Sequence, residues 1–386
     1  MADQVSEHSN QALSRFINCQ GWDCANIFKQ VSQSTSEIFE NYSPNEAKES
    51  LCLNKTALLI DEMGFRKKGS MSVGVGSQYL GCLGKTDNGQ VMVAAGLSKG
   101  NLFSPIDIRL FMPKKWETDT LRREKCHVPK EWKHQSKPGI AKQMIDDAIQ
   151  KGIKFDYVNF DALYGMCFDL LSHLNTKKIG FIGDVRSDCK LYFDHNKLES
   201  CRVDQFVSSL DPMKDFLKIR VRDSSKGHLV ARFYWCEVQI KCPHTTKLID
   251  LKLLVRKDQD GKIKYSLTNM LLDKIEELAQ KQAQRIFVEQ LFREGKNLVG
   301  LGDYQGRSWV GLHNHIALCC FAMYILLNIK IKNGEHGLSS KTIRECLCLF
   351  IEFKAKTLDQ AFEIIIKQHI RIKQQEERDR IRKNSS

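Results

Sequence analysis

The segment ALLIDE, Ala57 to Glu62, constrains the fold more than any other stretch of this chain. Four apolar residues run directly into two carboxylates, and a short apolar run of this kind is typical of a buried strand. A carboxylate that leaves such a strand needs a cation, a metal ion or an altered protonation state, because an unpaired buried charge is costly. We therefore expect other segments of the chain to supply a partner for these acids.

The segments after ALLIDE predict an α/β domain with the order three strands, helix, strand, helix, strand. The three strands are TALLIDE, SMSVGVGS and QVMVAAGLS, and residues 104–138 are predicted to form a loop. The spacing of apolar residues predicts helices in AKQMIDDAIQKG and MCFDLLSHLN. Each helix precedes a strand, IKFDYVNFD and then KIGFIGDV, and the first of these strands ends in Asp161.

The rest of the chain predicts further helical and β regions. From residue 186 the pattern changes to short strands separated by turn signals, and a long helix follows at LLDKIEELAQKQAQRIFVEQLFREGKN. We expect five regions: a helical N-terminal module (1–52) that either contacts DNA or packs on its neighbour, the first part of the α/β domain (53–185), an all-β insertion (186–270), a second part of the α/β domain carrying Glu289 (271–335), and a helical C-terminal region with a charged tail (336–386).

Charge and cysteine usage narrow the class of protein. Lys and Arg number 59 against 46 Asp and Glu, a formal net charge of +13, and the basic residues are spread along the chain. Such an excess suits a polyanionic partner but separates nucleic-acid binding from a soluble basic enzyme only weakly. Fourteen cysteines without CxxC spacing indicate reduced thiols. With no signal peptide and a longest apolar run of residues 316–327, we expect a cytoplasmic protein with no membrane partner.

Asp61 and Asp161 together predict a metal site. If their strands are neighbours, both carboxylates emerge at one edge of the sheet, where paired acids can hold two divalent cations for phosphoryl transfer. Hard oxygen ligands favour Mg²⁺, with Mn²⁺ as a substitute. Glu289 is the candidate third acid, since Arg285, Glu289 and Lys296 share one face of an ideal helix. An ordinary salt-bridged surface helix is the plainer interpretation of that face.

Four blocks occur in order along the chain. They are LLIDEMGFRKKGSMSVGVGSQYLGCLGKTDNGQVMVA, then DIRLFMPKKWETDTLRREKCHVP with FDYVNFDALYG, then the spacing Arg285, Glu289, Lys296, and then GLGDYQGRSWVGLHNHIAL. Together they resemble insertion-sequence transposases of the DDE superfamily endonuclease class. The spacing matches the Arg, Glu and Lys of the Tyr-Arg-Glu-Lys signature of related bacterial transposases. The resemblance covers roughly residues 12–355.

The resemblance implies a fold and a set of site residues. The fold is a ribonuclease H-like mixed sheet flanked by helices and interrupted by an all-β insertion, with helical N- and C-terminal regions. Periodicity leaves Asp61 and Glu62 as alternatives on opposite sides of the strand, and the resemblance selects Asp61. The metal-binding and catalytic residues are then Asp61, Asp161 and Glu289, and the DNA contacts are Arg285 and Lys296. Lys67 and Lys68 are expected to face the DNA backbone or to form a solvated basic turn.

The implied function is DNA transposition. Such a protein binds the terminal inverted repeats of its own element, cleaves at the ends by metal-dependent hydrolysis, and joins the 3′-hydroxyls to target DNA. It acts on double-stranded DNA as a homodimer in a synaptic complex, in the bacterial cytoplasm at the nucleoid. Two departures, Gln282 in place of the signature Tyr and Met63 after the acid pair, keep two alternatives open. These are an inactive or repurposed DNA-binding protein of the same fold, and a non-transposing Mg²⁺-dependent nuclease.

Overall fold

The computed structural model describes residues 10–19, 21–44, 54–193, 199–224, 227–271, 274–333 and 338–353, together with Ile366 and Ile370. The chain forms two compact units, one of residues 29–291 and one of residues 1–28 with 292–386. The division falls inside two helices, α2 (Cys24–Asn41) and α9 (Ile286–Leu298). It therefore does not coincide with the boundaries expected after residues 52, 185, 270 and 335.

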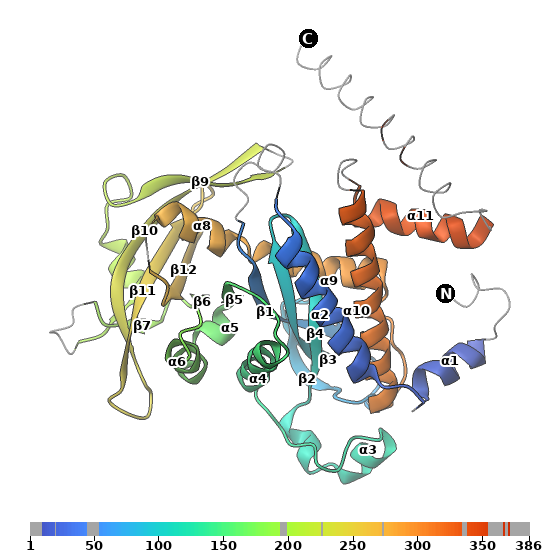
Figure 1. Cartoon of the computed structure of the whole chain (residues 1–386). Coiled ribbons are helices and arrows are strands. Elements are labelled where there is room, and N and C mark those ends of the chain that lie inside the picture. The colour runs from blue at the N-terminus through green and yellow to red at the C-terminus, as the bar shows by residue number, and fades with distance from the viewer. Residues whose placement is uncertain are drawn as a thin grey trace. The chain divides into compact units, whose positions relative to one another are not determined.

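A mixed sheet forms the centre of the larger unit (Figure 1). Its order among the described strands is β2-β3-β1-β5-β6-β12-β11-β10-β9, and β4 pairs with β3. Strands β1 (Ala57–Arg66), β5 (Tyr157–Phe160) and β6 (Phe181–Val185) run parallel, whereas β3 (Lys85–Lys99) is antiparallel to β1. The sheet is therefore the mixed one that a ribonuclease H-like fold requires. The remaining strands are β2 (Gly76–Leu80), β4 (Leu102–Phe111), β7 (Lys190–Leu191), β8 (Cys201–Arg202), β9 (Leu217–Ser224), β10 (Gly227–Lys241), β11 (Leu248–Lys257) and β12 (Ile263–Thr268).

Two strand predictions need correction. The loop expected over residues 104–138 begins with β4, which pairs with β3 along its whole length. Pro105 argues against a strand because it has no N–H to donate, but the pairing register shifts beside it, and such a bulge accommodates proline. The strand expected in SMSVGVGS starts only at Gly76, in β2.

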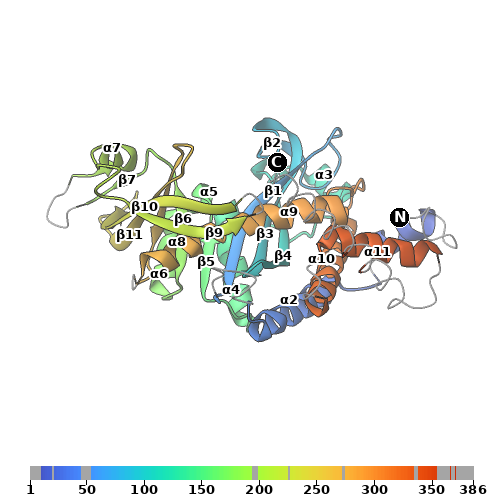
Figure 2. The ribbon, with the colours of Figure 1, turned by 90° about the horizontal axis from the view of Figure 1, so that it is seen from above.

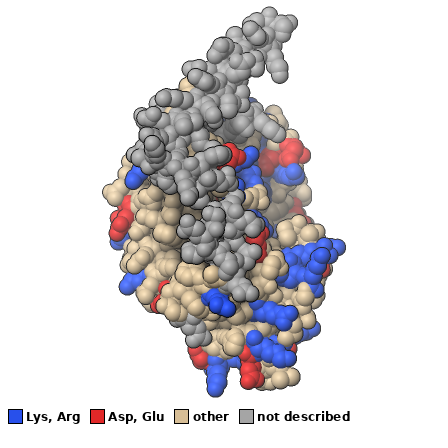
Figure 3. All heavy atoms as spheres, turned by 90° about the vertical axis from the view of Figure 1, so that its right-hand side faces the viewer, with Lys and Arg blue, Asp and Glu red and all other residues tan. Residues whose placement is uncertain are grey.

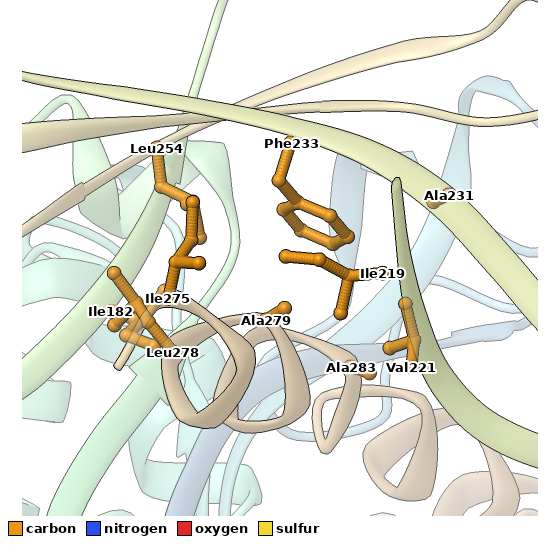
Figure 4. Close-up of a cluster of buried hydrophobic side chains, with 10 residues drawn as sticks. All are labelled: Ile182, Ile219, Val221, Ala231, Phe233, Leu254, Ile275, Leu278, Ala279 and Ala283. Atoms are coloured by element: carbon orange, nitrogen blue, oxygen red, sulfur yellow. The ribbon is translucent and has the colours of Figure 1, made fainter. Parts of the chain in front are cut away.

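The all-β insertion continues the central sheet. Strand β12 pairs antiparallel with β6, so β9 to β12 extend the sheet that begins with β2. Helix α8 (Ile275–Ala283) crosses one face of this extension and buries four residues at helical spacing, as Figure 4 shows. The cluster includes Ile182 of β6, so the insertion and the central strands share one core. Its members are Ile182, Ile219, Val221, Ala231, Phe233, Leu254, Ile275, Leu278, Ala279 and Ala283.

Helices cover the central strands on both faces. Asn159 of β5 donates to the carbonyl oxygen of Lys281 in α8, whereas the ring of its neighbour Phe160 packs on Tyr164 in α5 (Ala162–Gly165). Successive strand residues point to opposite faces, so α8 and α5 lie on different sides of β5. Helices α4 (Lys137–Gln150) and α6 (Phe168–Thr176) lie together on one side of the strands in Figures 1 and 2. The shorter elements of this unit are η2 (Lys114–Glu117), α3 (Thr120–Lys125) and α7 (Val203–Ser208).

The smaller unit contains α1 (Asn10–Asn18), α10 (Trp309–Lys332) and α11 (Ser340–Phe353). Asn314 of α10 donates to the carbonyl oxygens of Ile17 and Cys19, at 2.8 and 3.1 Å, and so ties the end of α1 to α10. Among the described residues, α10 is the one helix whose length and composition would suit a membrane span. Just over half of its apolar window, 56%, is buried inside the protein, as in core helices that never meet a membrane. The expected charged tail lies outside the described residues.

Candidate active site

Three aspartates form a row across β1, β5 and β6. Each of them directly follows one of three residues that lie in register on these parallel strands, Ile60, Phe160 and Gly183. Residues at the same register of neighbouring strands point to the same face. The row consists of Asp61, Asp161 and Asp184, on the face that α8 covers.

Asp61 lies within its strand rather than at its end. The sequence suggested that the strand stops at the acids, but β1 continues to Arg66 and pairs there with β3. Strand β5, in contrast, ends at Phe160. From Asp61 onwards β1 therefore pairs with no described strand on the β5 side. Burial raises the pKa of Asp61 to about 7; the charge of Arg285 opposes this shift and that of Asp161 adds to it.

Asp161 begins helix α5. Its carboxylate accepts a hydrogen bond from the backbone N–H of Leu163 at 2.9 Å, which makes it the N-cap of that helix. Burial raises the pKa of Asp161, whereas Arg285 and the backbone donors lower it. Both neighbouring aspartates therefore resist ionisation, as carboxylates that share one partly buried site must.

Glu62 faces the other side of β1. Its carboxylate accepts from Nζ of Lys137 at 2.9 Å and from the hydroxyl of Tyr164 at 3.4 Å. These partners belong to α4 and α5. The alternation expected from the strand therefore holds, and the residue that faces α8 is Asp61.

The long helix expected over residues 271–297 is two helices, α8 and α9, with a break at Gln284 and Arg285. Backbone hydrogen bonds of the i to i−3 type run through the break, from Phe287 to Gln284 and from Val288 to Arg285, both at 3.1 Å. The buried side chain of Gln284 donates to Oγ of Ser98 at 2.8 Å and to the carbonyl oxygen of Gly100 at 3.0 Å. Contact with the β3–β4 hairpin thus holds the break in place.

Arg285 projects from this break into the row of acids. Its Nη2 lies 3.3 Å from Oδ2 of Asp61, and its Nη1 lies 3.2 Å from Oδ2 of Asp184. The side chain is 21% exposed. Burial disfavours the guanidinium charge, but four surrounding carboxylates hold the pKa of Arg285 above its ordinary value; they are Asp61, Asp184, Asp161 and Glu289. Arg285 is therefore the cation that pairs with Asp61, whereas Lys137 pairs with Glu62.

Asp184 is supported from behind by two polar side chains. Ser266 of β12 donates to its Oδ1 at 2.6 Å, and the buried Gln282 donates through Nε2 to Oγ of Ser266 at 2.7 Å. Gln282, which the resemblance put at the position of the signature Tyr, thus supports through Ser266 the acid that pairs with Arg285. The contacts therefore run without interruption from Gln282 through Ser266 and Asp184 to Arg285 and Asp61.

Glu289 lies on the first turn of α9 and is exposed. It lines a cavity of about 90 Å³ between α8, α9 and the extended sheet. Neither Asp61 nor Asp161 lines this cavity. Its lining residues are Asp184, Leu229, Arg256, Lys264, Gln282, Ala283, Arg285, Ile286 and Glu289.

The other predicted DNA contacts lie apart from the acid row or in the other unit. Lys67 and Lys68 follow the end of β1, and the backbone of Lys67 is bonded to Asn88. They are six and seven residues beyond Asp61, or about 20 Å along a strand. Lys296 lies about two turns after Glu289 on α9 and belongs to the smaller unit. A role in DNA binding stays a prediction for all three lysines.

The predicted ligands are carboxylates, which suit a divalent cation, but they do not form a complete metal site. Among the described residues, no three Asp, Glu, His or Cys side chains converge closely enough to hold a metal ion. The guanidinium of Arg285 contacts both Asp61 and Asp184 and supplies positive charge there. Asp61 and Asp161 still offer adjacent hard oxygen ligands of the type that Mg²⁺ and Mn²⁺ prefer.

Sequence reasoning missed Asp184. The signal was present, because Asp184 follows the apolar run of KIGFIGDV just as Asp61 and Asp161 follow theirs. Ser266 and Gln284 had no such signal, since both act through contacts with segments far away in the sequence.

Comparison with known proteins adds a family match. Residues 1–203 match the family described as DDE superfamily endonuclease, a span that includes Asp61, Asp161 and Asp184 and ends before Arg285 and Glu289. A protein of Microchaete diplosiphon, named "Probable transposase for insertion sequence element IS701", is 36% identical over 190 residues. The aligned segment is 49% of this chain and 44% of that relative, so it spans less than half of either protein.

Proposed function

This chain belongs to the DDE superfamily endonucleases, and on that premise we propose that it is the transposase of an insertion sequence. It binds the terminal inverted repeats of its element, hydrolyses the DNA at the ends and joins the freed 3′-hydroxyls to target DNA. The observation that carries the proposal is the register of β1 and β5, which puts Asp61 and Asp161 on neighbouring strands and on the same face of the sheet. Adjacent carboxylates on neighbouring strands suit metal-dependent phosphoryl transfer.

Asp61 and Asp161 would hold the metal ion, with Glu289 as the third acid. A bound Mg²⁺ or Mn²⁺ supplies the polarisation of water and of the scissile phosphate. The protein positions its own groups for this chemistry: the α5 N-terminus orients Asp161, and the helix break presents Arg285. The Nε of Arg285 is buried without a partner among the described residues. The terminal nitrogens carry more N–H groups than their contacts with Asp61 and Asp184 use, so Arg285 keeps donor capacity for a DNA phosphate.

Double-stranded DNA is the proposed partner, as element ends and as target, bound by a homodimer at the nucleoid in the bacterial cytoplasm. The net charge of +13 supports a polyanionic partner. Figure 3 shows several Lys and Arg side chains on the lower part of one face, with Asp and Glu side chains beside the lowest of them. Because binding through phosphates releases counterions, the affinity for element-end DNA should fall steeply as the salt concentration rises.

The test is a nicking assay with Asp161→Asn. Asparagine keeps an oxygen that can accept from Leu163, so the α5 cap survives, whereas alanine would remove it at a cost of about 1 kcal/mol. Wild type with Mg²⁺ and labelled element-end DNA should nick at the ends, and Asp161→Asn should not. Asp260→Asn is the matched control, since Asp260 is an exposed acid paired with Lys262. Equal nicking by wild type and Asp161→Asn would refute the assignment.

A second candidate function is DNA binding without catalysis. Two observations favour it: Arg285 occupies the acid row, and Gln282 replaces the signature Tyr while bonding inside the fold. A protein that binds element ends in a salt-dependent way but nicks them with neither Mg²⁺ nor Mn²⁺ would match this candidate. A Mg²⁺-dependent nuclease of the same fold would nick DNA but would not join 3′-hydroxyls to a target, so a strand-joining assay separates it from a transposase.

A further inference from the structure

We propose that Asp184 is a positioning residue that withdraws Arg285 from Asp61 when a divalent cation binds. The inference rests on the proposed function, because it requires a metal ion at Asp61. In the structure the two terminal nitrogens of Arg285 contact different carboxylates, Nη2 that of Asp61 and Nη1 that of Asp184. The guanidinium can therefore lose one partner and retain the other.

Electrostatics gives the direction of this movement. A divalent cation on Asp61 and the guanidinium of Arg285 carry like charges and compete for the same carboxylate. Asp184 offers Arg285 an acceptor that the metal ion does not need. The net change is that the carboxylate of Asp61 exchanges Arg285 for the metal ion, while Arg285 keeps its contact with Asp184.

The surroundings of Asp184 suit a fixed anchor. Its Oδ1 is already taken by the hydroxyl of Ser266, which the buried Gln282 holds in turn. Only Oδ2 faces Arg285. Asp184 would have to break the Ser266 contact to bind a metal ion through both oxygens, so its support suits a hydrogen-bond acceptor for Arg285 better than a metal ligand.

The cavity gives the guanidinium room on the side away from Asp61. Arg285, Asp184 and Glu289 all line this space of about 90 Å³, whereas Asp61 and Asp161 do not. Two buried polar atoms beside it, Nε of Arg285 and Oε1 of Gln282, have no hydrogen-bond partner among the described residues. A guanidinium that turns into the cavity would keep Asp184 as a partner and would find Oε1 of Gln282 as a further acceptor.

The test is a double-mutant cycle on Mn²⁺ affinity. Mn²⁺ binding to the full-length protein is measured by electron paramagnetic resonance for wild type, Asp184→Asn, Arg285→Gln and the double variant, without DNA. Asp184→Asn leaves Asp61 as the remaining partner of Arg285, so it should weaken Mn²⁺ binding by about tenfold, a usual coupling for residues in contact. Arg285→Gln removes the competing cation and should tighten binding.

The diagnostic comparison is the effect of Asp184→Asn in the Arg285→Gln background. A positioning residue should have little effect there, because nothing remains to be positioned. Equal weakening in both backgrounds would overturn the inference, since it would make Asp184 a metal ligand or a general source of negative charge. If no variant and no wild-type protein bound Mn²⁺, the proposed function would fail and this inference with it.

Folding is controlled separately. Each variant is checked by circular dichroism and thermal unfolding in EDTA. If Asp184→Asn does not fold, Ser266→Ala replaces it, because that change keeps the charge of Asp184 and removes its support. Ser266→Ala should weaken Mn²⁺ binding by a few-fold when Arg285 is present. In the Arg285→Gln background the same change should leave Mn²⁺ binding unweakened. Unchanged Mn²⁺ affinity in Ser266→Ala with Arg285 present would count against the inference.

Discussion

Arg285 donates a hydrogen bond to Asp61, with Nη2 3.3 Å from Oδ2, across 224 residues of sequence. The contact places a permanent cation at the centre of the acid row. Neighbouring carboxylates repel one another when both are ionised, and a guanidinium lets them coexist before any metal ion binds. Under the proposed function, a metal ion that binds Asp61 has to compete with Arg285 for its carboxylate.

Arg285→Gln should destabilise the metal-free protein. Removing one member of a largely buried ion pair leaves Asp61 and Asp184 without their counter-charge, so the free energy of unfolding should fall by about 3 kcal/mol. Added Mn²⁺ should restore part of this loss, because a ligand of the native state stabilises it. Urea unfolding with EDTA and with Mn²⁺ measures both effects. Arg232→Gln, which removes one exposed contact to Pro212, should cost under about 0.5 kcal/mol; a similar loss in both variants would contradict the prediction.

Gly165→Ala should disturb the acid row through the backbone. A Cβ at Gly165 would collide with the carbonyl oxygen of Asp184, where α5 presses on β6. Because backbone cannot swing aside, we expect a loss of about 3 kcal/mol in the free energy of unfolding, as for an overpacked core. Gly81→Ala is the control, since nothing lies within 4 Å of its Cβ. Urea unfolding of the two variants checks the prediction, and equal stability would refute the close contact.

Gln284→Ala should loosen the helix break. The substitution removes two donors and leaves the buried hydroxyl of Ser98 and the carbonyl oxygen of Gly100 without them. The expected loss in the free energy of unfolding is about 2 kcal/mol. Gln259→Ala, at an exposed turn position, should cost almost nothing. Wild-type stability of Gln284→Ala in urea would show that the break forms without this anchor.

Asp146 of α4 should make a pH-dependent contribution to the free energy of unfolding through its contacts with His173 and Lys177. Burial opposes ionisation of Asp146, but hydrogen bonds from Lys177 and His173 hold its pKa below the usual 3.8. A lowered pKa stabilises the fold above the ordinary pKa, and this contribution is lost as the pH falls through the lowered value. Asp146→Asn should therefore be less stable than wild type by about 1 kcal/mol at neutral pH. The difference should shrink below pH 3.8; a constant difference down to acid pH would contradict the prediction.

The cysteines should differ sharply in reactivity. Burial raises the pKa of the Cys319 thiol to about 12, whereas Cys82 is exposed. The thiolate is the nucleophile, so the folded protein should react with iodoacetamide at Cys82 and not at Cys319. Mass spectrometry of native and urea-unfolded protein measures both sites. Rapid labelling of Cys319 in the folded state would show that α10 is not packed as described.

Much of the central sheet could be predicted from the sequence. The apolar runs of β1, β3, β5 and β6 appear as continuous hydrophobic segments, and each was predicted within a few residues, whereas the insertion was predicted only as a series of short strands from residue 186. Asp61 and Asp161 were also predicted, because an acid that ends an apolar run is conspicuous. Arg285 and Glu289 were first selected by helical periodicity, which puts them on one face with Lys296, and the family resemblance then matched their spacing.

The helix break and the pairing of the insertion with the central sheet could not be predicted from the local sequence. The break between α8 and α9 contains neither Gly nor Pro, and the helical pattern of the sequence continues through Gln284. What holds the break is a hydrogen bond from Gln284 to a hairpin about 186 residues earlier in the chain. The insertion looked like a separate β domain because periodicity identifies strands but not their partners. Among the described strands, the pairing of β12 with β6 joins the insertion to the central sheet.

Local chemistry thus determines which residues are apolar, which are acidic and where strands and most helices form. Register and charge pairing are set by long-range packing, because they depend on which distant segments share a core. Asp61, Asp161 and Asp184 become one row through the register of three parallel strands. Arg285, expected on one long helix, lies instead at the anchored break between α8 and α9 and projects into that row.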